Sequence, residues 1–469
     1  MRAIKYLYMA ALALTFAACS NEDDVLTQQP AEANGPITIT AQLAPKNGGA
    51  TRAVSDGGSS IVVNWAVDEH IAILYTKDET KYEADARITA VDGTTGVATI
   101  TFSVEGGTPD NTDCTIVYPK AAAKDDHTGV KDAAEWLAQQ DGTLNANLDV
   151  RVGEGKIQVT TPGLDVTTQP AAQYAIFKLT LKNSDASADL PATRLCVITG
   201  GATYTVAPAS AVSELYVALP AITSSAISFY AVNGANPLYL ASKSSVTFSS
   251  GYFYTSTVKM AQDEGVQLWD GGPRFAQANI GAAGPTDFGL YYAWAATTDN
   301  LSQGKEYTTA NTPYFQEKSG IYYIYSKYTK TKEAEGDGRI TLEACDDAAT
   351  ANWGGTWRMS TESEMNDLLN HTTKTFYYGD NKYNGANGVL LTGNGVPYTD
   401  KSIFFPYVGY RSGSSLNNVG TSGSFWLSTL DTNNSNNHSL GRHFLINSAQ
   451  TRTSNQGRQN GYPIRPMKP

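Results

Sequence analysis

Alternation of apolar and polar residues with a period of two constrains the fold of this chain more than any other feature. In residues 97–104 (VATITFSV) alanine, isoleucine, phenylalanine and valine alternate with threonine and serine, and residues 36–43 (PITITAQL) and 174–182 follow the same pattern. Successive side chains of a strand point to opposite faces of a sheet. These segments are therefore expected to form half-buried β-strands.

The strand signals recur at short spacing, with turn residues between them. Only 17% of residues are charged, whereas the chain holds 42 Gly and 27 Tyr, and this composition favours sheets and turns over helices. Further strands are expected at residues 61–65, 70–76, 114–118, 194–199, 214–219, 226–232 and 252–259, with one brief helix at 133–140. A length of 469 residues suggests about three folding units. The spacing indicates β-sandwiches in a mostly β chain.

The first residues carry a targeting signal. Arg2 and Lys5 precede an apolar run, residues 7–17, which is too short to span a bilayer, and Ala17-Ala18 leads into Cys19. This arrangement resembles a bacterial lipoprotein signal. The resemblance implies that residues 1–18 are removed and that Cys19 carries lipid, such as palmitate.

The segment after Cys19 is polar and acidic. Residues 20–24 (SNEDD) resemble the tags that send lipoproteins to the outer face of an outer membrane, and residues 19–35 have the composition of a tether. We therefore expect a lipid-anchored protein exposed at the cell surface. No later apolar run approaches the length of a membrane span.

Three further cysteines, Cys114, Cys196 and Cys345, have no C-x-x-C spacing. An odd number without such spacing fits neither a zinc site nor a disulfide framework. We expect them to be small buried residues. A single pair among them remains open.

Short motifs in residues 36–260 resemble those of fimbrillin (Mfa-like) pilus proteins, and they occur in the same order. They are Thr51-Arg52-Ala53, Trp65-x-x-Asp68-x-x-Ile71-x-Ile73, Tyr118-Pro119, Gln140-Asp141-Gly142-Thr143, Phe177-Lys178-Leu179 and Gly251-x-x-Tyr254. The resemblance implies two tandem transthyretin-like β-sandwiches, here residues 36–165 and 166–261. It also implies polymerisation by strand donation after proteolysis at an arginine.

In this chain the corresponding cut would follow Arg52 and release residues 36–43 together with the lipid. Removal of an edge strand exposes unpaired backbone groups above an apolar floor, which a strand of another pilin subunit can fill. The alternative is that Arg52 is an ordinary loop arginine and that the protein stays anchored. The sequence leaves both interpretations open.

Residues 262–469 read as a third unit with aromatic anchors. Its ordered motifs are Trp353-Gly354-Gly355-x-Trp357-Arg358-Met359, Ile403-Phe404-Phe405-Pro406-x-x-Gly409-Tyr410-Arg411, Gly423-x-Phe425-Trp426-x-Ser428-Thr429 and Gly461-Tyr462-x-Ile464-Arg465-Pro466. A helix is expected after Thr361, because Glu364 three residues later completes a capping box. The set resembles the FISUMP, or major paralogous, domain. That resemblance implies an α+β fold like that of C-type lectins.

The residues give no positive reason to expect an enzyme or a cofactor. The calcium-binding triplets of classical C-type lectins are absent, and Asp346 and Asp347 supply too few ligands for calcium, so capping is the favoured role for this pair. His438 and His443 lack the intervening Glu of a zinc protease. No nucleophile-elbow motif places a serine for catalysis.

Candidate ligand-binding residues are concentrated between Trp426 and Tyr462, two residues that read as core. The stretch between them is polar or basic and lacks apolar periodicity, which is typical of recognition loops. The candidates are Asn433, Asn434, Asn436, Asn437, His438, Arg442, His443, Arg452, Asn455, Gln456 and Arg458. For any one of them a solvated turn is the simpler interpretation. The density of Asn also resembles a binding face diversified by adenine-mutating retroelements.

Charge is distributed unevenly along the chain. The net charge is −11, but from Lys401 onward seven Lys and Arg stand against one acid, Asp431. This asymmetry fits an anionic partner or a chance local excess. No basic run interleaved with aromatic residues indicates nucleic-acid binding.

Together the patterns predict a pilus tip or accessory adhesin with a two-sandwich stalk and a lectin-like head. The subunit would accept a strand but would not donate one at its C-terminal end, which belongs to the head. The alternative is an anchored glycan-binding protein of a nutrient uptake system, outside any pilus.

Overall fold

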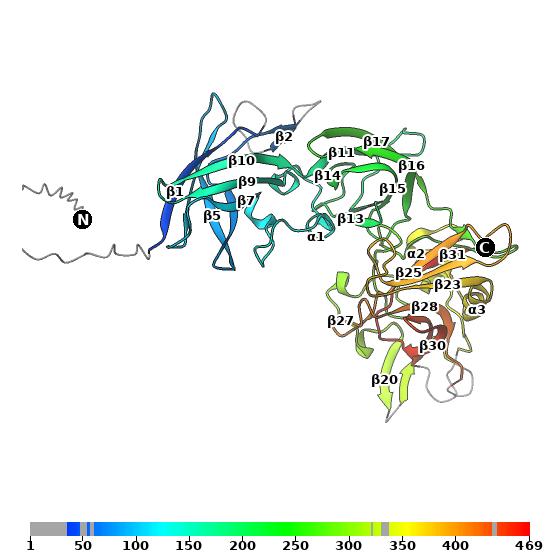
Figure 1. Ribbon diagram of the computed structural model, residues 1–469. Helices are drawn as coiled ribbons and strands as arrows, with labels where there is room; N and C mark the ends of the chain where they lie inside the picture. Colours follow the sequence, from blue (N-terminus) through cyan, green and yellow to red (C-terminus); the bar gives the residue numbers. More distant parts are fainter. Residues whose placement is uncertain (1–34, 47–53, 57–60, 320–321, 330–336, 434–438) are drawn as a thin grey trace, which may run out of the picture.

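The computed structural model describes residues 35–46, 54–56, 61–319, 322–329, 337–433 and 439–469. The chain is mostly β, as expected, and its parts follow one another along an elongated, bent body (Figure 1). Two β units make the stalk, and the C-terminal residues form a head. Within the described ranges no helix is both long and apolar enough to cross a membrane.

The first unit is one seven-stranded sheet in the order β1-β6-β5-β4-β7-β9-β10. The strands are β1 (Ile37–Leu43), β4 (His70–Lys77), β5 (Thr80–Val91), β6 (Ala98–Val104), β7 (Thr112–Tyr118), β9 (Arg151–Gln158) and β10 (Gly163–Ala172). The end strands β1 and β10 contact each other, so the sheet curls around its core. A small ribbon of β2 (Val54–Asp56) and β3 (Ile61–Val63) lies apart from this sheet.

The interior of the first unit is filled by the apolar residues of its alternating strands. In β6 the residues Ala98, Ile100, Phe102 and Val104 are all buried, as the period-two pattern predicts. The expected boundary between residues 165 and 166 is wrong in one respect. It falls inside β10, which pairs with β9 and completes the first sheet, so this unit extends to Ala172.

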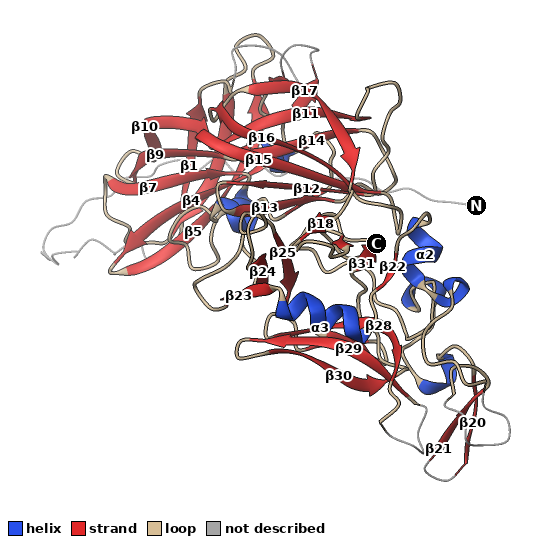
Figure 2. Cartoon of the chain, turned by 90° about the vertical axis from the view of Figure 1, so that its right-hand side faces the viewer, coloured by secondary structure: helices blue, strands red, loops and turns tan. Residues whose placement is uncertain are grey.

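The second unit is an eight-stranded sheet in the order β14-β11-β17-β16-β15-β12-β13-β8. The strands are β8 (Gln139–Gln140), β11 (Tyr174–Asn183), β12 (Arg194–Thr199), β13 (Ala202–Val206), β14 (Glu214–Pro220), β15 (Ile222–Val232), β16 (Tyr239–Phe248) and β17 (Phe253–Gln262). Strands β11 and β17 run parallel. The layers of this unit are seen edge-on in Figure 2.

The helix expected at residues 133–140 is shorter than predicted. Helix α1 (Ala133–Trp136) ends after one turn, and Gln139–Gln140 becomes β8, which pairs with β13. The side chain of Gln140 explains the change, because its amide nitrogen donates to the carbonyl of Ala218 at 3.0 Å and its oxygen accepts from the Ala218 amide at 2.8 Å. Extended chain places this side chain inside the second unit.

The two stalk units share a core. Ala72 and Leu74 of β4 and Val117 of β7 belong to the same buried cluster as residues of the second unit, such as Leu179 and Val217. The first sheet is therefore apolar on both faces where the second unit and its connecting segment cover it.

In the part of the head that the structure describes, there are short sheets and two α-helices. Its strands are β18 (Val266–Gln267), β19 (Arg274–Phe275), β20 (Phe315–Ser319), β21 (Tyr322–Tyr325), β22 (Arg358–Met359), β23 (Thr372–Tyr377), β24 (Gly388–Gly393), β25 (Ser402–Pro406), β26 (Tyr410–Ser412), β27 (Ser415–Asn417), β28 (Ser422–Leu430), β29 (Leu440–Asn447), β30 (Thr451–Gly457) and β31 (Pro466–Lys468). The helices are α2 (Ala348–Trp353) and α3 (Glu362–Asn370). Figure 2 shows α3 lying beside the sheet of β28, β29 and β30.

Local signals fix α3 as predicted. The Thr361 hydroxyl accepts from the Glu364 amide at 3.3 Å, and the Glu364 carboxylate accepts from the Thr361 amide at 2.9 Å, which completes the capping box. Met365 and Leu368 turn into the head core, where they meet Phe405, Phe425 and other aromatic residues.

The head packs tightly on the second stalk unit. Ala283 joins Cys196 and Val232 in one buried cluster, and Leu238 joins Trp353 in another. Outside these clusters, Arg194 pairs with Asp287 at 2.8 Å. The head is therefore seated on the stalk by apolar contacts and an ion pair.

Candidate strand-exchange and ligand-binding sites

Strand β1 is an edge strand that completes the core of the first unit. It pairs antiparallel with β6 over seven residues, from Ile37 opposite Val104 to Leu43 opposite Ala98. Ile39 and Leu43 are fully buried, whereas Thr38 and Thr40 on the other face are exposed. Among the described strands only β6 forms a ladder with β1. Loss of β1 would uncover the edge of β6 and the apolar residues beneath.

Lys46 fixes the chain just after β1. Its ammonium lies 3.2 Å from a carboxylate oxygen of Asp149, 3.4 Å from the ring centre of Tyr118 and 4.3 Å from that of Trp65. Burial lowers the pKa of Lys46 to about 8, against the opposing pull of Asp149. The Trp65 indole donates to the Ala44 carbonyl at 2.8 Å. Sequence reasoning missed Lys46, because its partners lie far along the chain.

Two predicted processing residues lie outside the described residues. These are Cys19, the expected lipidation site, and Arg52, the expected cleavage site. Arg52 falls in residues 47–53, between the Lys46 anchor and β2. A cut there would leave β1 held to the first unit by noncovalent contacts alone.

The predicted ligand-binding residues of the head divide into three groups. Asn434, Asn436, Asn437 and His438 lie outside the described residues. Asn433, Arg452, Asn455 and Gln456 are exposed. Arg442 is partly buried, whereas His443 and Arg458 are buried. The interpretation of these candidates as residues of an exposed recognition stretch is therefore wrong for His443 and Arg458.

His443 belongs to the core. It is 4% exposed, and its ring lies 5.1 Å from that of Tyr462 and 6.2 Å from that of Trp426. Burial lowers the pKa of His443 to about 4, and the nearby Arg442 adds to the effect. The imidazole is therefore neutral at pH 7 and packs against the aromatic residues, both of which are buried as predicted.

Arg458 is a fully buried cation. Its guanidinium lies 4.0 Å from the ring centre of Tyr325 and 4.7 Å from that of Trp294, and it donates to the Tyr328 carbonyl at 3.4 Å. Burial lowers the pKa of Arg458 to about 10, which leaves it charged at pH 7. Cation–π contacts of this kind are strongest when desolvated. Arg458 thus ties β21 to the end of β30.

Arg442 takes part in a network that braces the head sheet. It pairs with Glu362 at the start of α3, and its guanidinium lies 3.5 Å from a carboxylate oxygen of Asp431. The amide of Asn455 donates to the other oxygen of Asp431 at 2.9 Å. The surface left for a ligand is the exposed part of β30, which we call the β30 rim and define as Arg452, Asn455 and Gln456.

The acidic pair in the head has structural roles. Asp347 caps α2 by accepting from the Thr350 amide at 3.0 Å, and it also accepts from the Met359 amide at 2.8 Å, in line with the expected capping role. Asp346 accepts hydrogen bonds from the hydroxyls of Tyr314 and Tyr328.

Glu343, Cys345 and Asp346 offer atoms within 4.8 Å of one another, as a metal site would. The ammonium of Lys327 lies among them, 2.7 Å from Glu343 and 2.5 Å from Asp346. It supplies the positive charge that a metal would otherwise bring.

The remaining cysteines are free thiols. Cys114 and Cys196 are buried, as expected, and burial raises the pKa of the Cys114 thiol to about 12. Cys345 is exposed, so the expectation that it is buried is wrong. It lies in the short 3-10 turn Ala344–Asp346 that leads into α2, in which Ala344 is also exposed and only Asp346 is buried.

Comparison with known proteins finds similarity in solved structures only. No protein-family model and no curated protein matches the sequence. A fimbrial assembly protein from Parabacteroides distasonis is 12% identical over 47% of this chain and 90% of its own, with a TM-score of 0.28. A fimbrial protein from Bacteroides ovatus is 11% identical over 92% of this chain and 99% of its own, with a TM-score of 0.26.

A minor pilin from Streptococcus agalactiae is 9% identical over 50% of this chain and 99% of its own, with a TM-score of 0.21. These three structural neighbours are two fimbrial proteins and a pilin.

Proposed function

We propose that this chain is a cell-surface adhesin that joins a pilus by accepting a partner's strand and presents a ligand-binding head. The observation that carries the proposal is the seat of β1, by which we mean its position against β6 over the buried core of the first unit. An N-terminal edge strand with an alternating pattern covers the core of the first unit, and Arg52 follows the Lys46 anchor in the sequence. No enzymatic step is part of the proposal.

Exchange of β1 requires that another strand restore what is lost. Full burial of an isoleucine or leucine side chain contributes roughly 1.5–3 kcal/mol, so Ile39 and Leu43 together contribute roughly 3–6 kcal/mol. The ladder with β6 adds backbone hydrogen bonds. A cleaved β1 would therefore stay in place until a donor strand with the same alternation displaces it.

The position of β31 within the head supports a tip or accessory role. Strand β31 lies between β19 and β22 in the head, and Met467 is fully buried. Donation of this strand to another subunit would take apart the base of the head. A subunit that accepts a strand and cannot donate one ends a polymer.

At the membrane, the proposal places a lipid on Cys19, and cleavage after Arg52 frees the rest of the chain from that lipid. At the head, it places an unidentified host or microbial ligand on the β30 rim, because Arg452, Asn455 and Gln456 are exposed on a strand that pairs along its length with β29, which carries the buried Phe444. Adaptable polar groups on a rigid strand are typical of recognition surfaces.

The deciding experiment is limited proteolysis of the full chain, with Arg52→Ala as the matched control. The cut chain is mixed with a fluorescent peptide that corresponds to residues 36–43. We expect the cut wild-type chain to take up the peptide slowly, and the uncut Arg52→Ala chain not to take it up. Long homopolymers after cleavage would refute the tip position, and failure of the cut chain to exchange would refute strand acceptance.

The second candidate, an anchored glycan-binding protein outside any pilus, is favoured by the exposed amides of Asn455 and Gln456. A glycan array probed with the wild type and with a chain carrying alanine at Arg452, Asn455 and Gln456 tests it. Glycan binding that is lost in the triple variant, together with resistance of Arg52 to proteolysis, would favour this second function.

A further inference from the structure

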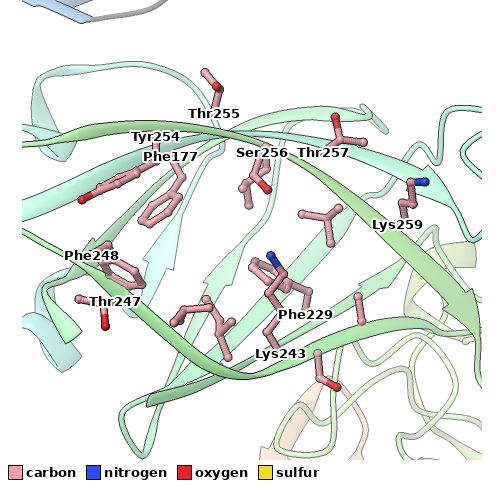
Figure 3. A pocket seen from close by; sticks show the side chains of 16 residues that line it. Phe177, Phe229, Lys243, Thr247, Phe248, Tyr254, Thr255, Ser256, Thr257 and Lys259 are labelled. Carbon is pink, nitrogen blue, oxygen red and sulfur yellow. The ribbon is translucent and has the colours of Figure 1, made fainter. Parts of the chain in front are cut away.

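Strands β16 and β17 separate soon after they meet. They pair only through Tyr239 with Gln262 and Leu240 with Ala261. Beyond these pairs they bow apart around a groove of about 480 Å³, shown in Figure 3. We call this space the β16/β17 groove and define it by residues 241–248 and 254–259 and the side chains beneath them.

Both walls of the groove are strand edges. The opposite edge of β16 pairs with β15, and the opposite edge of β17 pairs with β11. Along residues 241–248 and 254–259 the facing edges have no strand partner among the residues that the structure describes. Two such edges offer backbone donors and acceptors to an added strand from both sides.

The floor of the groove is apolar. It is formed by Phe177 and Leu179 of β11 and by Ile227 and Phe229 of β15, with Val258 at one side. Leu179, Ile227 and Val258 are buried, whereas Phe177 and Phe229 remain partly accessible through the groove. Alternate side chains of a bound strand would cover these rings.

One charge interrupts this lining. Lys243 lies opposite Ile227 in the sheet, so it shares the inward face with that residue, yet it is exposed because the groove is open. Its side chain rises into the hollow in Figure 3, whereas Lys259 points away. No Asp or Glu lines the groove, and within the described ranges Lys243 makes no ion pair. The inward face of the groove is thus cationic and unneutralised.

We propose that the β16/β17 groove binds one extended strand of a partner polypeptide, whose alternate side chains are apolar except for a carboxylate that faces Lys243. The walls supply the backbone hydrogen bonds, the floor buries the apolar side chains, and Lys243 selects for the acid. This site is separate from the seat of β1. It requires neither cleavage at Arg52 nor loss of any strand.

The competing explanation is that Lys243 keeps strands out. Inward-pointing charges protect open edges from nonspecific pairing. The two explanations differ in their response to charge. If Lys243 only protects the edges, strands of either charge are excluded. If Lys243 is a selective contact, strands with a negative charge bind more tightly than strands with a positive charge.

The test uses the full chain and two blocked, rhodamine-labelled peptides. The acidic probe is Thr-Leu-Thr-Glu-Thr-Val-Thr-Val, and the basic probe has Lys in place of Glu. We expect the wild type to bind the acidic probe about fivefold more tightly, the limit for an exposed ion pair. Lys243→Glu should reverse the preference. Lys259→Glu, which makes the same change of charge on a side chain that points away, should preserve it.

Hydrogen exchange locates the bound probe. Amides of residues 241–248 and 254–259 should become protected, and those of β6 should not change. The proposal is overturned if neither probe binds below about 1 mM. Equal binding of both probes, or the same preference in Lys243→Glu, would also overturn it. Uptake of the residue 36–43 peptide at the seat of β1 is measured separately, so either site can fail alone.

Discussion

Replacement of Ile39 by alanine is the most direct test of how β1 is held. The side chain of Ile39 is fully buried and belongs to the buried cluster of the first unit. In the ladder between β1 and β6, Ile39 pairs with Phe102. Isoleucine-to-alanine changes in cores cost about 2–5 kcal/mol through lost burial and the cavity that remains. An edge strand can settle into part of the cavity, so we expect about 2–3 kcal/mol.

Hydrogen exchange of β6 measures this loss locally. Each 1.4 kcal/mol corresponds to a factor of about ten, so amides of β6 should exchange roughly 30- to 150-fold faster in Ile39→Ala. Thr40→Ala is the matched control, because Thr40 lies on the same strand and faces solvent. It should change exchange by about threefold at most. Equal effects of the two substitutions would mean that β1 does not contribute to the core, and the strand-exchange proposal would lose its basis.

Three further predictions concern the head. Arg465 is buried and donates to Asn279 at 2.9 Å and to the Phe404 carbonyl at 2.9 Å, so Arg465→Ala should lower the free energy of unfolding in urea by about 3–5 kcal/mol. The exposed control Arg452→Ala should change it by about 0.5 kcal/mol at most, and equal losses would contradict this assignment of burial. The folded pKa of His443, about 4, lies below the unfolded value, so its contribution to the free energy of unfolding is fully present above about pH 6.5 and decreases as the pH falls toward 4. His443→Phe should reduce the stability lost between about pH 7 and about pH 4.5 by about 2–3 kcal/mol, and an unchanged loss of stability would show that another group titrates. Asp347→Ala should cost about 1–2 kcal/mol by thermal unfolding, because it removes the cap of α2, and an unchanged melting temperature would refute that role.

The parts of the fold with local signals could be predicted from the sequence. The capping box of α3 depends on two residues three positions apart, and β6 shows its alternation directly. Strand β9 gave no such signal. Its inward positions include Gly153 and Gly155, and a Cβ at Gly153 would lie 2.6 Å from the Thr168 carbonyl oxygen. Because β10 approaches β9 closely, glycine stands at inward positions where an apolar residue would otherwise be expected. The alternation of apolar and polar residues is therefore not visible in β9.

The candidate sites show the same limit. Polar residues of the C-terminal stretch read as surface, but the ring partners of Arg458 lie more than a hundred residues upstream, at Trp294 and Tyr325. Nothing local distinguishes Arg458 from exposed Arg452. The β16/β17 groove could not be predicted either, because the divergence of the two strands creates it and no local pattern marks where they separate.

The buried clusters that cross both junctions have a mechanical consequence. Leu74 of the first unit shares a cluster with the second, and Ala283 of the head shares another with Cys196. If flexible linkers joined the three parts, each part could rotate independently of the others under an applied force. Because the parts are joined in this way, we expect them to move as one bent body, so that a force applied to the head is transmitted to the first unit, where β1 pairs with β6.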